Sequence, residues 1–236
     1  MERISLEVIA RIQTDFPGKF GIPRQSGLVP KLQGRIVFEP AYRQEGILSG
    51  IEEFTHLWLL WGFSANAKGQ WSPTVCPPRL GGKVKKGVFA TRSPFRPNPI
   101  GLSCVRLLSV EKGEDGPVLI VAGADLMDQT PIYDIKPYLP YADAHPEAAG
   151  GFGEAHREDG IEVRFPEELL ARLPEEKRQA ALQVLQQDPR AAYNKKADYV
   201  YGMTFAGWDI RFTVQEDVLQ VCDVVDISNG EWEKIK

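Results

Sequence analysis

The sequence has few of the residues and motifs from which metal sites and membrane spans are built. It contains three histidines and three cysteines, and no group of them has metal-ligand spacing. The longest apolar run, residues 57–63, is far shorter than the roughly 20 residues of a transmembrane helix. The N-terminus alternates polar and apolar residues, as a strand does and a signal peptide does not. We therefore expect a soluble, cytoplasmic protein with reduced thiols and no metal.

Common catalytic and nucleotide-binding signatures are also missing. The sequence has no P-loop, no G-x-S-x-G, no H-E-x-x-H and no C-x-x-C. The glycine-rich stretch AAGGFGEAH, residues 148–156, follows no expected strand and opens no expected helix, so it is not a dinucleotide fingerprint. These absences weigh against a hydrolase of small phosphorylated metabolites. A nucleotide-like cofactor must be held in some other way.

Acidic residues are absent from one long window, residues 54–110. The whole chain has 28 basic and 32 acidic residues, so the residues outside the window carry a net charge of −12. The window predicts a surface that meets phosphates or another anion. The alternative is a solvated basic face without a partner. The eight cations are Lys68, Arg79, Lys83, Lys85, Lys86, Arg92, Arg96 and Arg106.

The hydrophobic pattern predicts a mainly β protein with a sandwich or a barrel in its N-terminal part. We expect strands at 3–14, 35–38, 56–63, 102–110, 118–124 and 132–138, and a short helical turn within 46–54. Residues 142–160 have the composition of a linker or a mobile loop. Two helices follow at 166–173 and 174–187, with Pro174 in the first turn of the second, and then three strands near 199–205, 209–214 and 218–225. This predicts domains at 1–155 and 160–236, the second a small α+β domain.

Three polar segments are candidates for chemistry. In residues 92–101, three prolines form a stiff frame for Arg92 and Arg96, although such arginines can also simply pair with acids. Residues 125–141 follow an apolar strand, and their carboxylates can bind hydroxyls or cations, act as bases, or cap turns. Asp188, Arg190 and Tyr193 follow a helix and can engage RNA or a substrate carboxylate, or form an ordinary polar turn.

Six segments together, in this order, resemble the TsaA-like family of tRNA threonylcarbamoyladenosine methyltransferases. They are IPRQSGL at 22–28, FTHLW at 54–58, PPRLGG at 77–82, GVFATRSPFRPNPIG at 87–101, DIKPYLP at 134–140 and DPR at 188–190. They span nearly the whole chain, and the block at 87–101 is the most specific.

The resemblance implies a small antiparallel β-barrel domain that binds S-adenosylmethionine and a small C-terminal domain that helps hold tRNA. It also implies a homodimer. The implied reaction moves a methyl group onto the exocyclic nitrogen of threonylcarbamoyladenosine at tRNA position 37, in the anticodon loop. The alternative is a non-catalytic RNA- or nucleotide-binding module of the same fold.

The resemblance also implies which residues contact the cofactor. Among these positions, Ser64-Ala65 stands where related sequences often have His-Gln. Gln129 stands where glycine is usual, at a turn where positive φ is expected. In the C-terminal motif, Ala191 replaces a proline. The implied cofactor residues are Pro23, Arg24, Gln25, Ser64, Ala65, Arg92, Leu102, Asp128, Gln129, Thr130 and Pro131.

Asp188, Arg190 and Tyr193 lie in the C-terminal domain, away in sequence from every implied cofactor residue, so we expect them to meet the other substrate. The accepting nitrogen is urea-like and a poor nucleophile while it keeps its proton, so a nearby base would assist transfer. Asp188 and Tyr193 are the candidate bases. Charge complementarity predicts that Arg190 positions the threonyl carboxylate.

Overall fold

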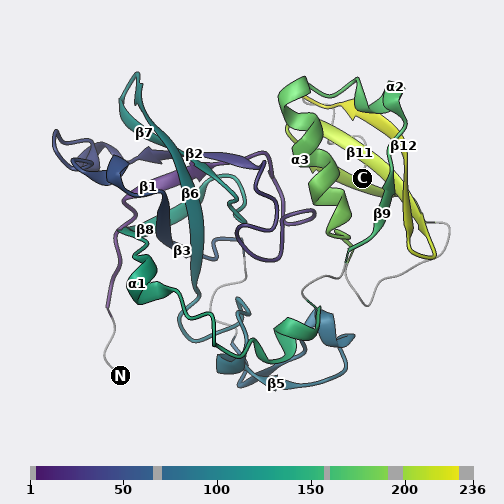
Figure 1. Cartoon of the computed structure of the whole chain (residues 1–236), viewed down its shortest axis with the longest axis horizontal. Helices are drawn as coiled ribbons and strands as arrows, with labels where there is room; N and C mark the ends of the chain where they lie inside the picture. Colours follow the sequence, from purple (N-terminus) through teal and green to yellow (C-terminus); the bar gives the residue numbers. More distant parts are fainter. Residues whose placement is uncertain (1–3, 66–70, 157–159, 191–198, 229–236) are drawn as a thin grey trace.

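The structure is a computed structural model that describes residues 4–65, 71–156, 160–190 and 199–228, without the side chains of residues 79, 155 and 156. It is mainly β with few helices, as predicted (Figure 1). Its strands fall into a six-stranded group, a four-stranded group and a two-stranded pair. Within these ranges no helix combines the length and the apolarity that crossing a membrane requires.

The six-stranded group forms a closed barrel in the order β1-β2-β7-β6-β3-β8, and β8 pairs back with β1. All six pairings are antiparallel. Alternate side chains such as Ile12, Ile36, Leu57 and Leu119 are fully buried inside it, because successive strand residues point to opposite faces. The strands are β1 (Ala10–Gln13), β2 (Gln33–Phe38), β3 (His56–Gly62), β6 (Ile100–Gly113), β7 (Gly116–Ala122) and β8 (Thr130–Pro137).

The first strand is shorter than the alternation predicts. Residues 4–9 are not in a strand, and Ile4 and Leu6 are 82% and 49% exposed. Pairing with β2 and β8 begins only at Ala10. The apolar residues of the alternation before Ala10 therefore have no neighbouring strands that would bury them. The prediction of a strand from residue 3 was therefore wrong at its N-terminal end.

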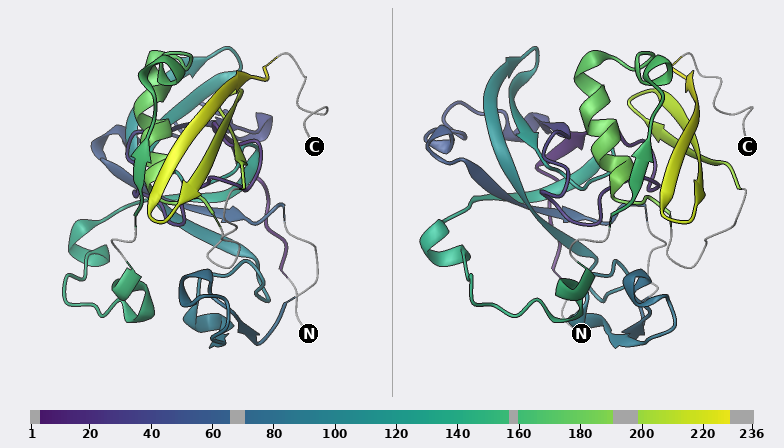
Figure 2. Two further views of the ribbon diagram at one scale, coloured as in Figure 1. Left: turned by 90° about the vertical axis from the view of Figure 1, so that its right-hand side faces the viewer. Right: turned by 45° about the vertical axis from the view of Figure 1, so that its right-hand side comes forward.

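A long excursion between β3 and β6 leaves the barrel and lies beneath it in Figure 1. The segment 142–160, expected to be a linker or a mobile loop, runs beside this excursion (Figures 1 and 2) and contains the end of α1 (Pro140–Asp143) and all of η5 (Gly151–His156). It is therefore structured rather than a plain linker. The excursion holds β4 (Thr74–Val75), η3 (Pro78–Leu80), β5 (Lys86–Gly87) and η4 (Val88–Ala90), and two more short helices, η1 (Pro40–Tyr42) and η2 (Ile51–Glu53), lie between β2 and β3.

The C-terminal part is a four-stranded sheet in the order β10-β11-β12-β9, with two helices packed on it. The helix α3 buries Ala180, Ala181, Val184 and Leu185 against the sheet. Only β9, which runs parallel to β12, was not predicted; its three residues are too few for a periodic pattern. The elements are β9 (Glu162–Arg164), α2 (Glu167–Leu170), α3 (Glu175–Gln186), β10 (Tyr201–Phe205), β11 (Trp208–Gln215) and β12 (Val218–Asp226).

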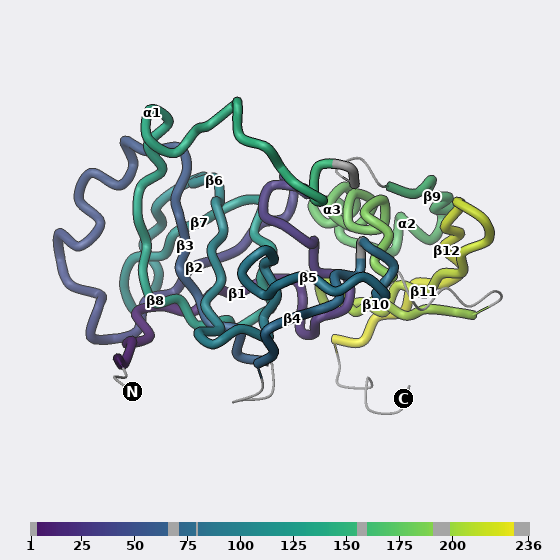
Figure 3. Tube along the Cα trace, turned by 90° about the horizontal axis from the view of Figure 1, so that it is seen from below, coloured from purple at the N-terminus to yellow at the C-terminus, as the bar shows by residue number. Residues whose placement is uncertain are grey.

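Residues 14–32, here called the strap, leave the barrel between β1 and β2 and cross to the C-terminal sheet. The course of the strap from the barrel to the C-terminal part can be followed in Figures 1–3. Its residues Phe16, Val29 and Leu32 are buried in the same core as α3. The ammonium of Lys177 lies 2.7 Å from the Asp15 carboxylate. The strap therefore belongs to the barrel by sequence and to the second core by packing.

Candidate functional site

A cleft of about 630 Å³, here called the central cleft, gathers residues that are far apart in the sequence. It joins Pro23, Arg24 and Gln25 of the strap to Arg92 of the proline-rich loop and to Leu102 of β6. Five of the implied cofactor residues, from three segments, thus line one cavity. The remaining lining residues are Trp61, Phe63, Phe89, Thr91, Arg96, Pro97, Asn98, Ile100, Gly101 and Asp125.

A close backbone approach positions the strap at this cleft. The Gly27 amide donates to the Gly123 carbonyl oxygen at 2.8 Å. Gly123 has φ +79°, and a Cβ there would lie 3.2 Å from the Gly27 Cα, so a side chain would be both strained and crowded. This contact brings Gln25 within reach of the proline-rich loop, where its side-chain oxygen accepts a 2.5 Å hydrogen bond from Arg92.

The proline-rich loop is also organised by hydrogen bonds to its own chain. The Arg96 guanidinium donates to the Thr91 carbonyl oxygen at 3.1 Å, and the Phe95 amide donates to the Ser93 hydroxyl at 3.2 Å. Arg92 and Arg96 thus bond to an amide and a carbonyl oxygen, and among the described residues neither forms an ion pair within 4 Å.

One acid of the cleft, Asp125, opens the candidate segment 125–141 but was not among the implied cofactor residues. Asp125 follows β7 and accepts a 2.6 Å hydrogen bond from the Ser103 hydroxyl, which in turn accepts one from the Trp61 indole at 2.9 Å. Burial raises the pKa of Asp125, and the Ser103 hydrogen bond, backbone hydrogen bonds and the charge of Arg92 partly oppose that rise. No sequence spacing relates these three residues: the pairing of β3 with β6 brings Trp61 to Ser103, and the turn after β7 adds Asp125.

The other implied cofactor residues lie outside the central cleft. The Asp128 carboxylate accepts a 2.9 Å hydrogen bond from the Thr14 amide, and the buried Thr130 hydroxyl donates to the Met127 carbonyl oxygen. Gln129 has φ +62°, the conformation expected where relatives have glycine. Pro131 is buried in β8. The turn thus lies where β1 ends and β8 begins, and its hydrogen bond to Thr14 holds the two strands together there.

Ser64 and Ala65 are exposed directly after β3. Neither lines the central cleft, but the neighbouring Phe63 does. The Ser64 amide donates to the Gly62 carbonyl oxygen, so this end of β3 turns back on itself.

A larger cleft of about 1600 Å³ adjoins the central cleft and shares Arg24, Gln25 and Arg92 with it. Its walls include the exposed aromatic rings of Trp71, Phe89 and Phe95. Residues 150 and 152–154, from the segment expected to be a linker, also line it.

Several cations of the acid-free window lie on the same excursion as part of this cleft's wall. Lys83 and Lys85 are exposed, and the Lys86 ammonium lies 5.9 Å from the centroid of the Phe152 ring. Lys68 and the side chain of Arg79 lie outside the described residues. The window thus carries exposed charge and aromatic rings on one excursion.

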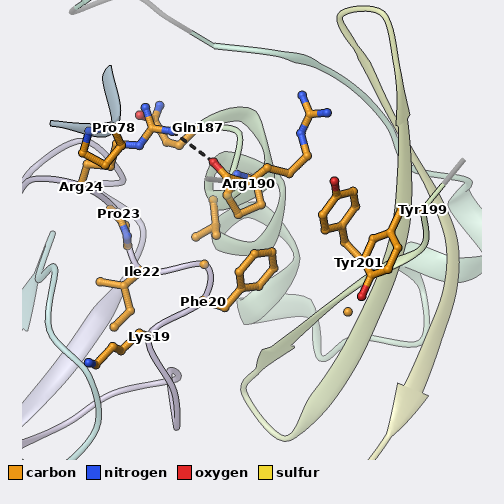
Figure 4. A pocket seen from close by; sticks show the side chains of 14 residues that line it. Lys19, Phe20, Ile22, Pro23, Arg24, Pro78, Gln187, Arg190, Tyr199 and Tyr201 are labelled. Atoms are coloured by element: carbon orange, nitrogen blue, oxygen red, sulfur yellow. Dashed lines mark hydrogen bonds between the residues drawn. The ribbon is translucent and has the colours of Figure 1, made fainter. Parts of the chain in front are cut away.

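A third cavity, of about 630 Å³, lies between the strap and the C-terminal part (Figure 4). The Arg24 guanidinium donates to the backbone carbonyl oxygens of Asp188 and Arg190, at 3.3 and 3.5 Å. Arg24 lines all three cavities, so it connects the implied cofactor residues with the DPR turn.

Asp188 and Arg190 are bound to each other. The Arg190 guanidinium donates to both Asp188 carboxylate oxygens, at 2.8 and 2.9 Å, and Arg190 is only 5% exposed. This ion pair raises the pKa of Arg190. Asp188 itself has φ +46°, so the turn is held in a conformation that non-glycine residues seldom adopt. Tyr193, the third predicted residue, lies outside the described residues.

Comparison with known proteins decides the family. The tRNA-methyltransferase O N-terminal domain matches residues 11–144, and the TrmO C-terminal domain matches residues 158–227. The chain belongs to the TrmO family. The TsaA-like resemblance is thereby confirmed.

Two bacterial relatives of this TrmO family member match along most of their length. A tRNA (adenine(37)-N6)-methyltransferase of Escherichia coli K12 is 42% identical over 91% of this chain and 93% of that protein. A protein of the same name from Eikenella corrodens is 46% identical over 69% of this chain and 92% of its own. The crystal structure of TrmO from Pseudomonas aeruginosa matches with a TM-score of 0.75 and 34% identity, covering 95% of this chain and all of that one.

Proposed function

We propose that this TrmO family member is an S-adenosylmethionine-dependent methyltransferase that methylates the exocyclic nitrogen of threonylcarbamoyladenosine at position 37 of tRNA. The relatives named as tRNA (adenine(37)-N6)-methyltransferases support the reaction. We further propose that it acts in the cytoplasm as a homodimer. In this proposal residues 1–155 hold the cofactor in the barrel domain, and residues 160–236 help hold the tRNA.

The observation that carries the proposal is the set of residues lining the central cleft. S-adenosylmethionine has an anionic carboxylate, two cationic groups and an aromatic base. Arg24 and Arg92 suit the carboxylate, because guanidinium groups bind carboxylates with charge-assisted hydrogen bonds. Phe63 and Phe89 offer aromatic walls for the base. When bound, the cofactor would supply an electrophilic methyl group.

The turn Asp128–Pro131 and the pair Ser64-Ala65 complete the proposed cofactor residues. They do not line the central cleft of the single chain. Gln129 adopts positive φ, which costs about 1 kcal/mol in a residue other than glycine. That the turn keeps this costly conformation supports its proposed role in cofactor binding.

For the other substrate, we propose that Asp188, Arg190 and Tyr193 face the modified nucleoside. Since both Asp188 oxygens accept hydrogen bonds from Arg190, the first role of Asp188 is to hold that guanidinium in place. The protein's main contribution to transfer is then alignment of the accepting nitrogen and exclusion of water.

Mass spectrometry of nucleosides tests the proposal. Purified protein treated with EDTA is incubated with isotopically labelled S-adenosylmethionine and tRNA that carries or lacks threonylcarbamoyladenosine. We expect label only in the modified nucleoside, and only with the modified tRNA. Equal methylation of plain adenosine would contradict the substrate, loss of transfer on EDTA treatment would contradict the metal-free site, and cofactor binding without any transfer would favour a non-catalytic binding module.

A further inference from the structure

Asp125 is the one acid among the described residues that line the central cleft. The cations there are Arg24, Arg92 and Arg96. A ligand that carried only negative charge would gain nothing from a carboxylate in this wall. The lining therefore fits a ligand with charge of both signs.

The Asp125 carboxylate is held rigidly. Its Oδ1 accepts the hydrogen bond from Ser103, which is fully buried and is itself oriented by the Trp61 indole. The Trp61 ring lies against Gly101, where an added Cβ would come within 2.3 Å of the indole. Gly101 thus lets the ring occupy the position from which it orients Ser103.

Keeping a carboxylate at this position opposes folding, because its burial penalises the charged form. The hydrogen bond from Ser103 would be retained by an asparagine, whose side-chain oxygen also accepts. The hydrogen bond from Ser103 by itself therefore does not require a negative charge, and the backbone hydrogen bonds and the charge of Arg92, which favour one, only partly offset the effect of burial. A bound cation would supply a reason for one.

We propose that Asp125 is the residue that binds the positive charge of the cofactor, at its sulfonium or its ammonium group, opposite the arginines that take its carboxylate. This assignment rests on the proposed function. Asp125 is then a cofactor-binding residue beyond those that the family motifs imply, and it contributes to selecting a charged ligand over a neutral one.

Calorimetric titration with three ligands tests the assignment. S-adenosylmethionine carries both cationic groups, S-adenosylhomocysteine keeps only the ammonium, and 5′-methylthioadenosine carries neither. Asp125→Asn should weaken S-adenosylmethionine binding about 10- to 100-fold, as expected for loss of a hydrogen-bonded charge partner. It should leave 5′-methylthioadenosine binding unchanged. S-adenosylhomocysteine binding falls as well if the contact is the ammonium, and stays unchanged if it is the sulfonium; either result supports the proposal.

The controls separate this assignment from folding and from the proposed function. Asp115→Asn removes an exposed acid whose contact is a 3.9 Å ion pair with Arg43, and should bind all three ligands as the wild type does. Ser103→Ala should weaken S-adenosylmethionine binding less than Asp125→Asn, since it loosens the carboxylate but keeps its charge. Equal weakening of all three ligands, or unchanged S-adenosylmethionine affinity, in a variant with wild-type melting behaviour overturns the role of Asp125. Wild-type protein that binds none of them overturns the proposed function as well.

Discussion

The guanidinium of Arg24 donates a hydrogen bond to the backbone carbonyl oxygen of Asp188, 3.3 Å away and 164 residues further along the chain. The same side chain lines the central cleft beside Gln25 and Arg92. One residue thus touches both the proposed cofactor site and the turn proposed to face the nucleoside. The strap that carries it is anchored in the second core by Phe16 and Val29.

Replacing Arg24 by lysine should therefore affect both substrates. Lysine keeps the charge but lacks the planar fork that spans the two carbonyl oxygens of Asp188 and Arg190. We expect about tenfold weaker cofactor binding, near the lower end for a charge-assisted hydrogen bond, together with slower single-turnover transfer. Arg35→Lys is the matched control, because Arg35 forms an exposed ion pair with Glu111 on the barrel. Wild-type cofactor affinity and a wild-type transfer rate in Arg24→Lys would contradict a role of Arg24 at both substrates.

The lysines of the excursion should contribute to the salt dependence of tRNA binding. Changing Lys83, Lys85 and Lys86 together to glutamine should reduce the slope of log K against log salt by up to about 3, roughly one for each phosphate contact. Because Lys86 lies over the Phe152 ring, the Lys83/Lys85 pair should account for about two of these.

Cofactor affinity should survive the triple change, because none of these lysines lines the central cleft. A change of Lys112 to glutamine, in the β6–β7 hairpin, serves as the control for nonspecific charge loss. A slope that stays at the wild-type value in the triple variant would mean that the excursion faces away from RNA.

The ion pair between Asp188 and Arg190 predicts how their variants compare. Asp188→Asn and Arg190→Gln should slow single-turnover transfer by similar factors, because each dissolves the same bidentate contact. Asp188→Asn should also lower the melting temperature, since a buried guanidinium without its partner costs about 3 kcal/mol. Cofactor binding should be affected less than transfer in both variants.

A loss in Asp188→Asn that exceeds the loss in Arg190→Gln by about 100-fold or more would instead make Asp188 the general base. Measuring both variants on tRNA with and without threonylcarbamoyladenosine shows whether Arg190 recognises the threonyl carboxylate. If Arg190 does recognise this carboxylate, Arg190→Gln should erase the preference for the modified tRNA.

Asp125→Asn should stabilise the ligand-free protein at neutral pH. Burial raises the folded-state pKa of Asp125 above its usual 3.8. The folded protein therefore loses stability as the pH rises from 3.8 toward the folded-state pKa, because the buried carboxyl must then ionise. Asparagine avoids this loss. Calorimetric melting should show the advantage at neutral pH and its decline as the pH falls toward 3.8. A variant less stable than the wild type at neutral pH would show that the charge stabilises the fold.

The sequence by itself determined the family, the mainly β character and most strands and helices. Local patterns suffice for these features: a continuous apolar run marks β3, Pro174 stands immediately before α3, and the block at 87–101 is specific as a string of letters. It also located Pro23–Gln25, Arg92 and Leu102, which the structure brings into one cleft.

Only the tertiary structure decided how distant segments meet. The register of β3 with β6 places Trp61 by Ser103, and the turn after β7 adds Asp125; no sequence spacing encodes that contact. The packing of the strap into the second core brings Arg24 to Asp188. Alternation also could not locate the first residue of β1, because a strand extends only as far as its neighbours pair with it. That pairing is a property of the barrel and not of the segment.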